Sequence, residues 1–459
     1  MKLQSINPND QTIVGELEVS TEDEIKKQVE KARKTLDSWK NISVEERCLY
    51  ISKLKDLLNK NKDKLARLMT LEMGKPLQQS VGEIESELEF IEYYAKNGPK
   101  FFADESIIEN EKDNYKVTYE PYGVCACISP WNFPVSMVTS GVLPAITAGN
   151  TVVVKPSEYT SLSQKMVVDL LNETGIPEGV VNLVIGGGNE GKILVDSKID
   201  LVWFTGSTKA GMDIYKKCGE KFIKSLLEMG GSSAGIVMAD ANMENAIENL
   251  YWARFLNCGQ VCTAVKRLFV EKSIFEKFTN SFAERVNKAK VGNPLKDNDI
   301  GPLVTKRQLE IIKDQIDDAI SKGAKVLIGG KQPKDTELLM GNYYLPTILT
   351  NVNFDMKVMN EETFGPVISI MPFETEEEAI TLANRTEYGL SSEIYTSDLE
   401  KGTGMARKIQ SGTVAINTDN FFKPECPFGG FKKSGTGREY GKIGMQEFAQ
   451  VKVIAICKV

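Results

Sequence analysis

The first hundred residues carry apolar side chains at helical spacing. Apolar residues that recur three or four positions apart lie on one face of a helix. In residues 22–40 this spacing is kept by Ile25, Val29, Ala32, Leu36 and Trp39. It continues in ERCLYISKLKDLLNKNKDKLARLM and VGEIESELEFIEYYA. We therefore expect this part of the chain to form a layer of helices.

From about residue 116 the pattern changes to short β-rich runs that alternate with helical segments. The runs are KVTYEPYGVCACI, TVVVK, VVNLVI, DLVWFTGS and FIKSLLEMGG, and several of them are almost entirely apolar. Helices are expected between them, near residues 136–147, 161–174 and 209–219. Such an alternation indicates a parallel sheet covered on both faces. A second alternating series, from SAGIVMAD to about residue 430, predicts a second α/β domain.

Composition and charge narrow the class of protein. The chain has 459 residues, of which 41% are hydrophobic and 26% charged, as expected for a globular protein of two or three domains. The net charge is −7, with acids and bases interleaved, so there is no basic stripe and no nucleic-acid partner is expected. The N-terminal MKLQSINPNDQT lacks the apolar core of a signal peptide, and apolar stretches are interrupted before membrane-spanning length. We expect a cytoplasmic protein with no membrane partner.

The chain contains eight cysteines and no histidine. Eight cysteines in so long a chain do not suggest a disulfide framework, and most are expected to be buried thiols. Without histidine there is no Ser–His or Cys–His dyad and no HExxH zinc site. Proton transfer must therefore use carboxylates, lysine, tyrosine, cysteine or water.

Two cysteines, Cys258 and Cys262, lie four apart in NCGQVCTA. They could be metal ligands, a disulfide, a redox pair or core residues, or one could be a nucleophile. A second ligand pair is missing and the spacing is not CxxC, so neither a metal site nor a thiol oxidoreductase is expected. If residues 257–262 are helical, both thiols share one face, which favours burial of at least one. Small neighbours favour an accessible Cys262, so we predict that Cys262 is the nucleophile and Cys258 its packed neighbour.

Two strand ends together suggest a dinucleotide site. In DLVWFTGSTKAG, an apolar strand, a glycine turn and a helix start present free N–H groups that suit a pyrophosphate, although an ordinary turn glycine gives the same pattern. TVVVKPSE ends in Lys155 and Glu158. A carboxylate there can accept the ribose hydroxyls of an adenosine and repel a 2′-phosphate, but alone the two residues are a solvated charge pair. Together the two stretches favour NAD over NADP.

Two further stretches carry groups suited to catalysis. In PWNFP, prolines hold Asn132, whose amide could donate to an oxygen that gains charge, and a rigid loop with a packed Trp explains the stretch equally well. Glu228 ends an apolar run before two glycines, where apolar surroundings should raise its pKa as a general base requires, unless it points into solvent. The absence of histidine favours the catalytic interpretation.

Together with further motifs, these stretches resemble the NAD(P)-dependent aldehyde dehydrogenase family. The resemblance runs from INPND to the C-terminus, with the motifs in the family's order: PWNFP, VVVKPSE, FTGS, LEMGG, NCGQVCTA, EETFGPV, NRTEYGL, GTVAIN and PFGGFKKSGTGRE. It implies an α/β aldehyde dehydrogenase-like fold with three parts. These are a Rossmann-like NAD-binding domain (1–115 and 130–236), an α/β catalytic domain with the thiol (237–430) and a small β oligomerisation segment (116–129 and 431–459). Because family members usually assemble through such a segment, a homodimer or homotetramer is expected.

The resemblance also implies a role for each matching residue. Cys262 matches the nucleophile, Glu228 the general base, and Asn132, with the backbone N–H of Cys262, the oxyanion hole. The implied reaction is NAD-dependent oxidation of an aldehyde to the carboxylic acid through a Cys262 thiohemiacetal and thioester, with hydrolysis assisted by Glu228. The positions that match cofactor contacts are Trp131, Lys155, Glu158, Gly206, Ser207, Glu362 and Phe364.

The substrate is narrowed by positions that match the family's substrate tunnel. Members that act on succinate semialdehyde resemble one another in an Arg where this chain has Ser140. The matching tunnel residues are mostly apolar: Phe133, Ser140, Leu256, Val261, Thr263, Phe422 and Phe428. We therefore expect a neutral aliphatic, hydroxy or aromatic aldehyde. The alternatives are a succinate-semialdehyde-type dehydrogenase, a CoA-acylating aldehyde dehydrogenase, which usually lacks the Glu at position 228, and a Cys-dependent hydrolase or esterase without redox chemistry.

Overall fold

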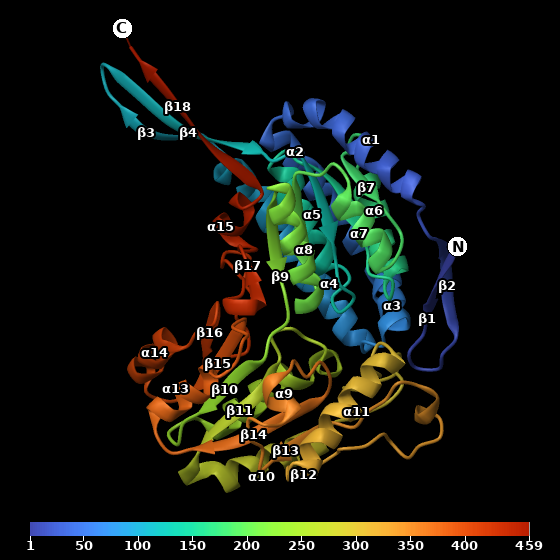
Figure 1. The fold of residues 1–459 in the computed structure, drawn as a ribbon, viewed down its shortest axis with the longest axis vertical. Coiled ribbons are helices and arrows are strands. Elements are labelled where there is room, and N and C mark those ends of the chain that lie inside the picture. Colours follow the sequence, from blue (N-terminus) through green and yellow to red (C-terminus); the bar gives the residue numbers. More distant parts are fainter. Residues whose placement is uncertain (459) are drawn as a thin grey trace.

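The computed structural model describes residues 1–458, which form two large sheets, each flanked by helices, together with a three-stranded arm and an N-terminal hairpin (Figure 1). The large sheets contain the parallel strands that the alternating pattern predicts, so the α/β fold class is confirmed. No helix within residues 1–458 is both long and apolar enough to span a bilayer.

The chain begins with an antiparallel hairpin instead of the expected helix. Strands β1 (Lys2–Ile6) and β2 (Ile13–Glu18) pair around the turn-forming residues Asn7 to Asp10. The helical prediction is wrong here because the first helix starts only after Thr21, whose hydroxyl accepts the backbone N–H of Glu24 in a capping box. Beyond this point the prediction is confirmed: the helices are α1 (Glu22–Lys40), α2 (Val44–Lys60), α3 (Lys62–Met73) and α4 (Leu77–Phe101).

The first large sheet has six strands in the order β17-β9-β8-β5-β6-β7. Its strands are β5 (Val124–Ile128), β6 (Thr151–Lys155), β7 (Val181–Leu183), β8 (Leu201–Thr205), β9 (Lys224–Glu228) and β17 (Gly435–Thr436). The connecting helices are α5 (Ser136–Thr147), α6 (Ser161–Glu173), α7 (Gly188–Asp196) and α8 (Thr208–Lys221). The chain runs outward from β5 in one direction through β6 and β7 and in the other through β8 and β9. The carboxyl ends of β5 and β8 therefore flank a switch point, where ligands bind in open α/β sheets.

The second large sheet has seven strands in the order β12-β13-β14-β11-β10-β15-β16. Its strands are β10 (Ser233–Val237), β11 (Val265–Glu271), β12 (Lys325–Ile328), β13 (Thr347–Thr350), β14 (Val367–Phe373), β15 (Ser391–Tyr395) and β16 (Thr413–Ile416). The helices of this part are α9 (Met243–Phe255), α10 (Phe275–Asn287), α11 (Lys306–Ser321), α12 (Lys357–Asn360), α13 (Glu376–Asn384) and α14 (Leu399–Lys408). Residues 229–232 join the two sheets, so the boundary expected at residue 236 falls inside β10.

A three-stranded arm projects from the part of the molecule that contains the first large sheet (Figure 1). It consists of β3 (Glu105–Glu109), β4 (Asp113–Pro121) and β18 (Ala449–Cys457), paired in the order β18-β4-β3. The expected segment of 116–129 and 431–459 differs from this arm because strand pairing decides membership: β3 joins the arm, whereas β5 and β17 join the first sheet. The tail that was expected to be β-rich also contains the short helix α15 (Gly441–Gln446), and Val459 lies outside the described residues.

Candidate active site

A cavity of about 390 Å³ brings together the predicted nucleophile and the predicted general base. Cys262 lines it from the loop before β11, and Glu228 lines it from the end of β9 in the other sheet. Most of the remaining wall is apolar or aromatic, with Phe90, Phe133, Phe421, Phe422, Phe428 and Tyr440. The two groups therefore share one apolar chamber although they come from different parts of the fold.

The chain reaches Cys262 through an irregular turn. After α9, residues Leu256–Gly259 form one 3₁₀ turn, in which Asn257 and Cys258 have φ values of 52° and 57°. Gly259 also has positive φ, and a Cβ on it would lie 2.3 Å from the carbonyl oxygen of Gly365. This segment is not a continuous helix, so the two thiols do not share a helix face. Cys258 is buried in the core of the second sheet, and Cys262 is the partly exposed thiol of the two.

The Cys262 thiol is protonated at neutral pH in this structure. Burial raises its pKa to about 12, and the carboxylates of Glu362 and Glu228 raise it further, whereas the ammonium of Lys266 lowers it. Because the thiolate is the reactive form, a nucleophilic Cys262 has to lose its proton when the reaction starts.

Glu228 is positioned as the sequence suggests, facing the cavity and not solvent. It is 5% exposed, and its Oε2 has no hydrogen-bond partner among the described residues. Burial raises its pKa well above the ordinary value, and the nearby Glu439 carboxylate raises it further. Burial also raises the pKa of Glu439, to about 7, and Glu439 Oε1 accepts a hydrogen bond of 2.7 Å from Trp203 Nε1. The sequence analysis did not identify Glu439, although it lies within the motif PFGGFKKSGTGRE.

Two hydrogen bonds join Asn132 to residues 257–260, which precede Cys262. Its Nδ2 donates to the carbonyl oxygen of Gln260 over 3.1 Å, and its own carbonyl oxygen accepts from Asn257 Nδ2 over 3.0 Å. An amide nitrogen carries two hydrogens, so this contact engages one of them and the other is available to a second acceptor. The PWNFP segment and the Cys262 loop are thus held as one unit.

A buried ion pair that the sequence analysis missed supports the same segment. Lys75 and Glu83 pair with side chains only 1% and 2% exposed. The Lys75 ammonium lies 3.9 Å from the ring centroid of Phe133, and Glu83 Oε1 accepts the backbone N–H groups of Val135 at 2.9 Å and Ser136 at 3.2 Å. The pair therefore fixes the chain directly after Asn132.

The residues of the two stretches expected to bind a dinucleotide lie at the carboxyl ends of β6 and β8, the two strands that flank β5. Lys155 ends β6, and its ammonium donates to the carbonyl oxygens of Pro156 and Gly186. Glu158 follows it, while Gly206 and Ser207 connect β8 to the first turn of α8. The hydroxyls of Thr205 and Thr208 are buried at this turn, and neither has a hydrogen-bond partner within residues 1–458. Unsatisfied donors at a helix N-terminus suit an anionic pyrophosphate, so the residues present fit the expected cofactor.

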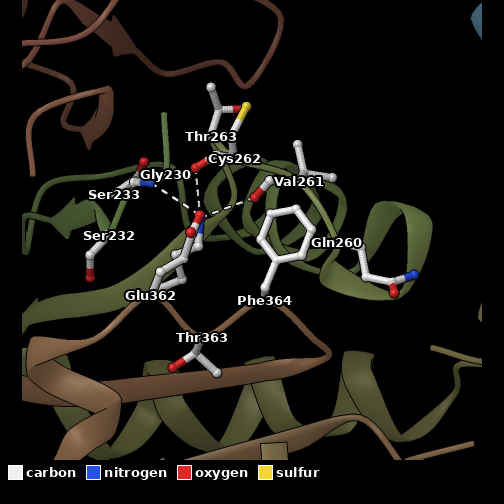
Figure 2. A network of polar contacts seen from close by, with 12 residues as sticks. Gly230, Ser232, Ser233, Gln260, Val261, Cys262, Thr263, Glu362, Thr363 and Phe364 are labelled. Carbon is white, nitrogen blue, oxygen red and sulfur yellow. Dashed lines mark hydrogen bonds and ion pairs between the residues drawn. The ribbon is translucent and has the colours of Figure 1, made fainter. Parts of the chain in front are cut away.

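The remaining expected cofactor contacts lie beside Cys262. The rings of Trp131 and Phe364 meet edge to face with centroids 5.6 Å apart. Figure 2 shows Glu362 facing the loop that carries Val261 and Cys262. The Glu362 carboxylate accepts the backbone N–H of Gly231 over 3.0 Å, so it links its own segment to the residues after Glu228.

Six of the seven expected tunnel residues line the cavity, namely Phe133, Leu256, Val261, Thr263, Phe422 and Phe428. Ser140 is not among the lining residues; it is buried in α5, which reaches the cavity one turn earlier through Ser136 and Met137. The lining also includes carboxyl groups that the sequence analysis did not identify, from Glu83, Glu87, Glu393, Asp419 and Glu439. Among the described lining residues, Lys75 is the one basic side chain, and Glu83 neutralises it.

The chain is similar to known proteins along almost its whole length. The sequence model of the aldehyde dehydrogenase family matches residues 1–454. The chain is similar to a betaine aldehyde dehydrogenase of Bacillus subtilis (strain 168), with 37% identity covering 97% of this chain and 92% of the relative. It is also similar to a glutarate-semialdehyde dehydrogenase of Pseudomonas putida, with 36% identity covering 98% and 93%.

A crystal structure shows the same likeness in three dimensions. The structure is similar to that of a betaine aldehyde dehydrogenase from Staphylococcus aureus in complex with NAD+, with a TM-score of 0.96 and 34% identity over 99% of this chain and 91% of that one. Both the sequence and the structural likeness extend over almost the whole chain. The chain therefore belongs to the aldehyde dehydrogenase family.

Proposed function

We propose that this protein oxidises a neutral aldehyde to the carboxylic acid with NAD as the hydride acceptor and Cys262 as the nucleophile. The observation that carries the proposal is the shared cavity. It holds the Cys262 thiol together with the buried carboxyl group of Glu228, whose Oε2 has no hydrogen-bond partner within residues 1–458, and the Cys262 loop is bonded to Asn132. In a chain without histidine, these are the groups available for nucleophilic attack and for activating water.

The reaction begins when Cys262 loses its proton and its thiolate attacks the aldehyde carbon. The free N–H of the Asn132 amide and the backbone N–H of Cys262 stabilise the oxyanion of the resulting thiohemiacetal. A bound NAD would supply the acceptor for the hydride of this carbon, and Cys262 would then carry a thioester. The carboxylate of Glu228 then takes a proton from water, and the hydroxide equivalent attacks the thioester and releases the carboxylic acid and the thiol.

Residues at two strand ends hold the cofactor in this proposal. Lys155 and Glu158 contact the adenosine ribose, and Gly206 and Ser207 contact the pyrophosphate. Glu362 and Phe364, with Trp131, hold the nicotinamide riboside near Cys262. A carboxylate at position 158 repels the 2′-phosphate of NADP, so we propose that NAD is preferred.

The charges in the cavity support a neutral substrate. A semialdehyde with a terminal carboxylate would need a free cation, whereas the one lysine in the described lining is paired with Glu83, and four further lining residues carry carboxyl groups in addition to Glu83 and Glu228. Desolvation of an unpaired carboxylate costs several kcal/mol. Neutral aliphatic, hydroxy or aromatic aldehydes avoid this cost and pack against the aromatic wall. The presence of Glu228 favours water over CoA as the acyl acceptor.

The arm supports a proposal about assembly. Strand β18 exposes a run of apolar residues, Val451, Val453, Ile454 and Ile456, and extended exposed strands are prone to pair or pack with another chain. We propose that the arm joins two copies in a homodimer or homotetramer. Sedimentation of the full chain beside a variant with Val451 and Val453 changed to Lys tests this, and equal sedimentation of the two proteins as monomers contradicts it.

One experiment tests the activity. The absorbance of reduced nicotinamide is followed with NAD and then NADP across acetaldehyde, hexanal, lactaldehyde, benzaldehyde, betaine aldehyde and succinate semialdehyde, with Cys262→Ala as the blank. We expect thiol-dependent reduction of NAD with neutral aldehydes. A strong preference for succinate semialdehyde would contradict the charge argument. Absence of reduction with every aldehyde, by folded protein that binds NAD, would favour a CoA-dependent or hydrolytic reaction.

A further inference from the structure

Lys266 is a fully buried lysine four residues after Cys262, and no motif indicated a role for it. It is the second residue of β11, and its side chain is 0% exposed. Its ammonium donates to the carbonyl oxygen of Val261 over 3.0 Å and to that of Cys262 over 2.6 Å. The third direction faces Glu362, with Nζ 3.6 Å from Oε1. Buried ammonium groups are rare without such partners, and here the partners belong to the nucleophile loop and to one carboxylate.

The contacts of the same ammonium join the segment of Glu362 to the loop of Val261 and Cys262, and a hydrogen bond of Glu362 extends this network to a third segment. Glu362 accepts the N–H of Gly231, and a Cβ on Gly231 would lie 2.8 Å from the carbonyl oxygen of Cys262. The segment after Glu228, the loop of Cys262 and the segment of Glu362 are therefore packed around one positive charge. Loss of this side chain would remove the lysine donor from the carbonyl oxygen of Cys262 and leave that of Val261 with the backbone N–H of Ala264.

Lys266 also differs in sign from the other ionisable groups that act on the thiol. Among the described residues, Glu228 and Glu362 raise the pKa of Cys262, and Lys266 lowers it. The groups that face Lys266 itself are Glu362, Cys262 and the buried guanidinium of Arg254. The nucleophile thus lies between two carboxyl groups that oppose its ionisation and one ammonium that favours it.

We propose that Lys266 is a positioning residue of this active site, which holds the backbone of the nucleophile loop and places a positive charge beside the Cys262 thiol so that the thiolate forms more readily. The inference rests on the proposed role of Cys262 as the nucleophile. It assigns to Lys266 two separable effects, a backbone contact and a charge. The charge is the part that a pH profile can isolate.

Burial lowers the pKa of Lys266 to about 8, and the Glu362 carboxylate opposes this shift. Lys266 is therefore charged below about pH 8 and increasingly neutral above it. Arginine at the same position would stay charged throughout the range in which proteins are assayed. The stabilisation of the Cys262 thiolate by Lys266 should decrease as the pH rises, whereas stabilisation by an arginine should persist.

The test is the rate at which iodoacetamide alkylates Cys262 between pH 6 and pH 9.5. The Cys262 peptide is quantified by mass spectrometry, because the exposed Cys426 and Cys457 also react. For Lys266→Met we expect alkylation about tenfold slower at pH 7, which corresponds to a shift of about one pKa unit, and a difference that shrinks toward pH 9. Lys266→Arg should restore the rate at pH 7 and exceed the wild type at pH 9. Lys432→Met is the matched control, since Lys432 also donates to two backbone carbonyls but outside the cavity, and it should match the wild type.

Two results would overturn the proposal: equal rates in Lys266→Met and the wild type, or a deficit of the same size at every pH that arginine does not rescue. If Lys266→Met does not fold, the comparison of Lys266→Arg with the wild type carries the test. The two rates should be similar at pH 7 and the arginine variant should be faster at pH 9, and equal rates at pH 9 would count against the proposal. The assay uses neither aldehyde nor NAD. A protein with this pH profile and no aldehyde oxidation would contradict the proposed function and leave the role of Lys266 intact.

Discussion

Loss of one member of the Lys75–Glu83 pair should destabilise the protein far more than loss of both. The two side chains are 1% and 2% exposed, so neither can be solvated when its partner is removed. Breaking a buried ion pair in this way costs about 3–5 kcal/mol, whereas replacing both members by neutral groups of similar volume is often close to neutral. Lys75→Met leaves the Glu83 carboxylate unpaired. In Lys75→Met/Glu83→Gln, the amide oxygen can still accept the N–H groups of Val135 and Ser136.

The magnitude can be measured by differential scanning calorimetry of the wild type, the two single variants and the double variant. Each kcal/mol lowers the midpoint by about 2–4 °C in a domain of 150–250 residues, so Lys75→Met should lower it by roughly 6–20 °C. The double variant should recover most of this loss, and the cycle gives the coupling between the two residues. Lys55→Met, which breaks the exposed pair with Glu92, is the matched control and should leave the midpoint almost unchanged.

Two outcomes would refute this reasoning. If the double variant unfolds at or below the midpoint of Lys75→Met, the loss does not come from an uncompensated charge. If Lys75→Met unfolds within about 2 °C of the wild type, the pair contributes no more than an exposed ion pair does. Activity is a second readout, because the double variant keeps the acceptor for Val135 and Ser136 but loses the ammonium beside Phe133: its aldehyde oxidation rate should fall.

Three further predictions concern carboxyl groups of the cavity. Glu228→Gln should slow hydrolysis of the thioester more than hydride transfer, so stopped-flow absorbance should show a burst of reduced cofactor followed by slow turnover, and absence of a burst would require another role for Glu228. Glu439→Gln removes a like charge that raises the pKa of Glu228, so the acidic limb of the hydrolysis rate should move to lower pH, and a shift to higher pH would contradict this. Burial raises the pKa of Glu87 to about 8, above its value of about 4.3 in the unfolded chain. Between these two pH values the folded protein keeps a proton that the unfolded chain releases, so the free energy of unfolding falls as the pH rises through this range. The unfolding midpoint of Glu87→Gln should therefore drop less between pH 5 and pH 9 than that of the wild type, and parallel curves would exclude Glu87 as the titrating group.

The parts of the fold that depend on local periodicity could be predicted from the sequence. Helices α1 to α4 and the buried strands β5, β6 and β8 follow directly from apolar spacing. Strand partners could not be predicted in the same way, because pairing is a contact between distant segments. For this reason β3 and β17 were placed in the wrong part of the fold, and the N-terminal hairpin was missed.

The candidate site shows the same division. Cys262 and Glu228 could be selected because their neighbours in sequence are small or apolar and because no histidine competes for their roles. Lys266 and Lys75 could not be selected from the sequence, because a lysine is expected to be a solvated charge until its burial and its partners are known. Ser140 was selected because it matches a position of the family's substrate tunnel, but the direction in which α5 presents its side chains decides which of them reach the cavity.

The chain returns from the second domain to the first sheet, and this return affects the order in which parts of the protein can fold during synthesis. Strand β17 pairs with β9 opposite Glu228, and Glu439 accepts from Trp203 across 236 residues of sequence. During synthesis the N-terminal part folds first, with the edge of β9 still open, and every strand of the second sheet is made before β17. A chain interrupted before residue 435 therefore contains Cys262, Glu228 and Asn132 but lacks Glu439 and part of the cavity wall. Completion of the active site is thus coupled to synthesis of the second domain, so unfinished chains are not competent enzymes.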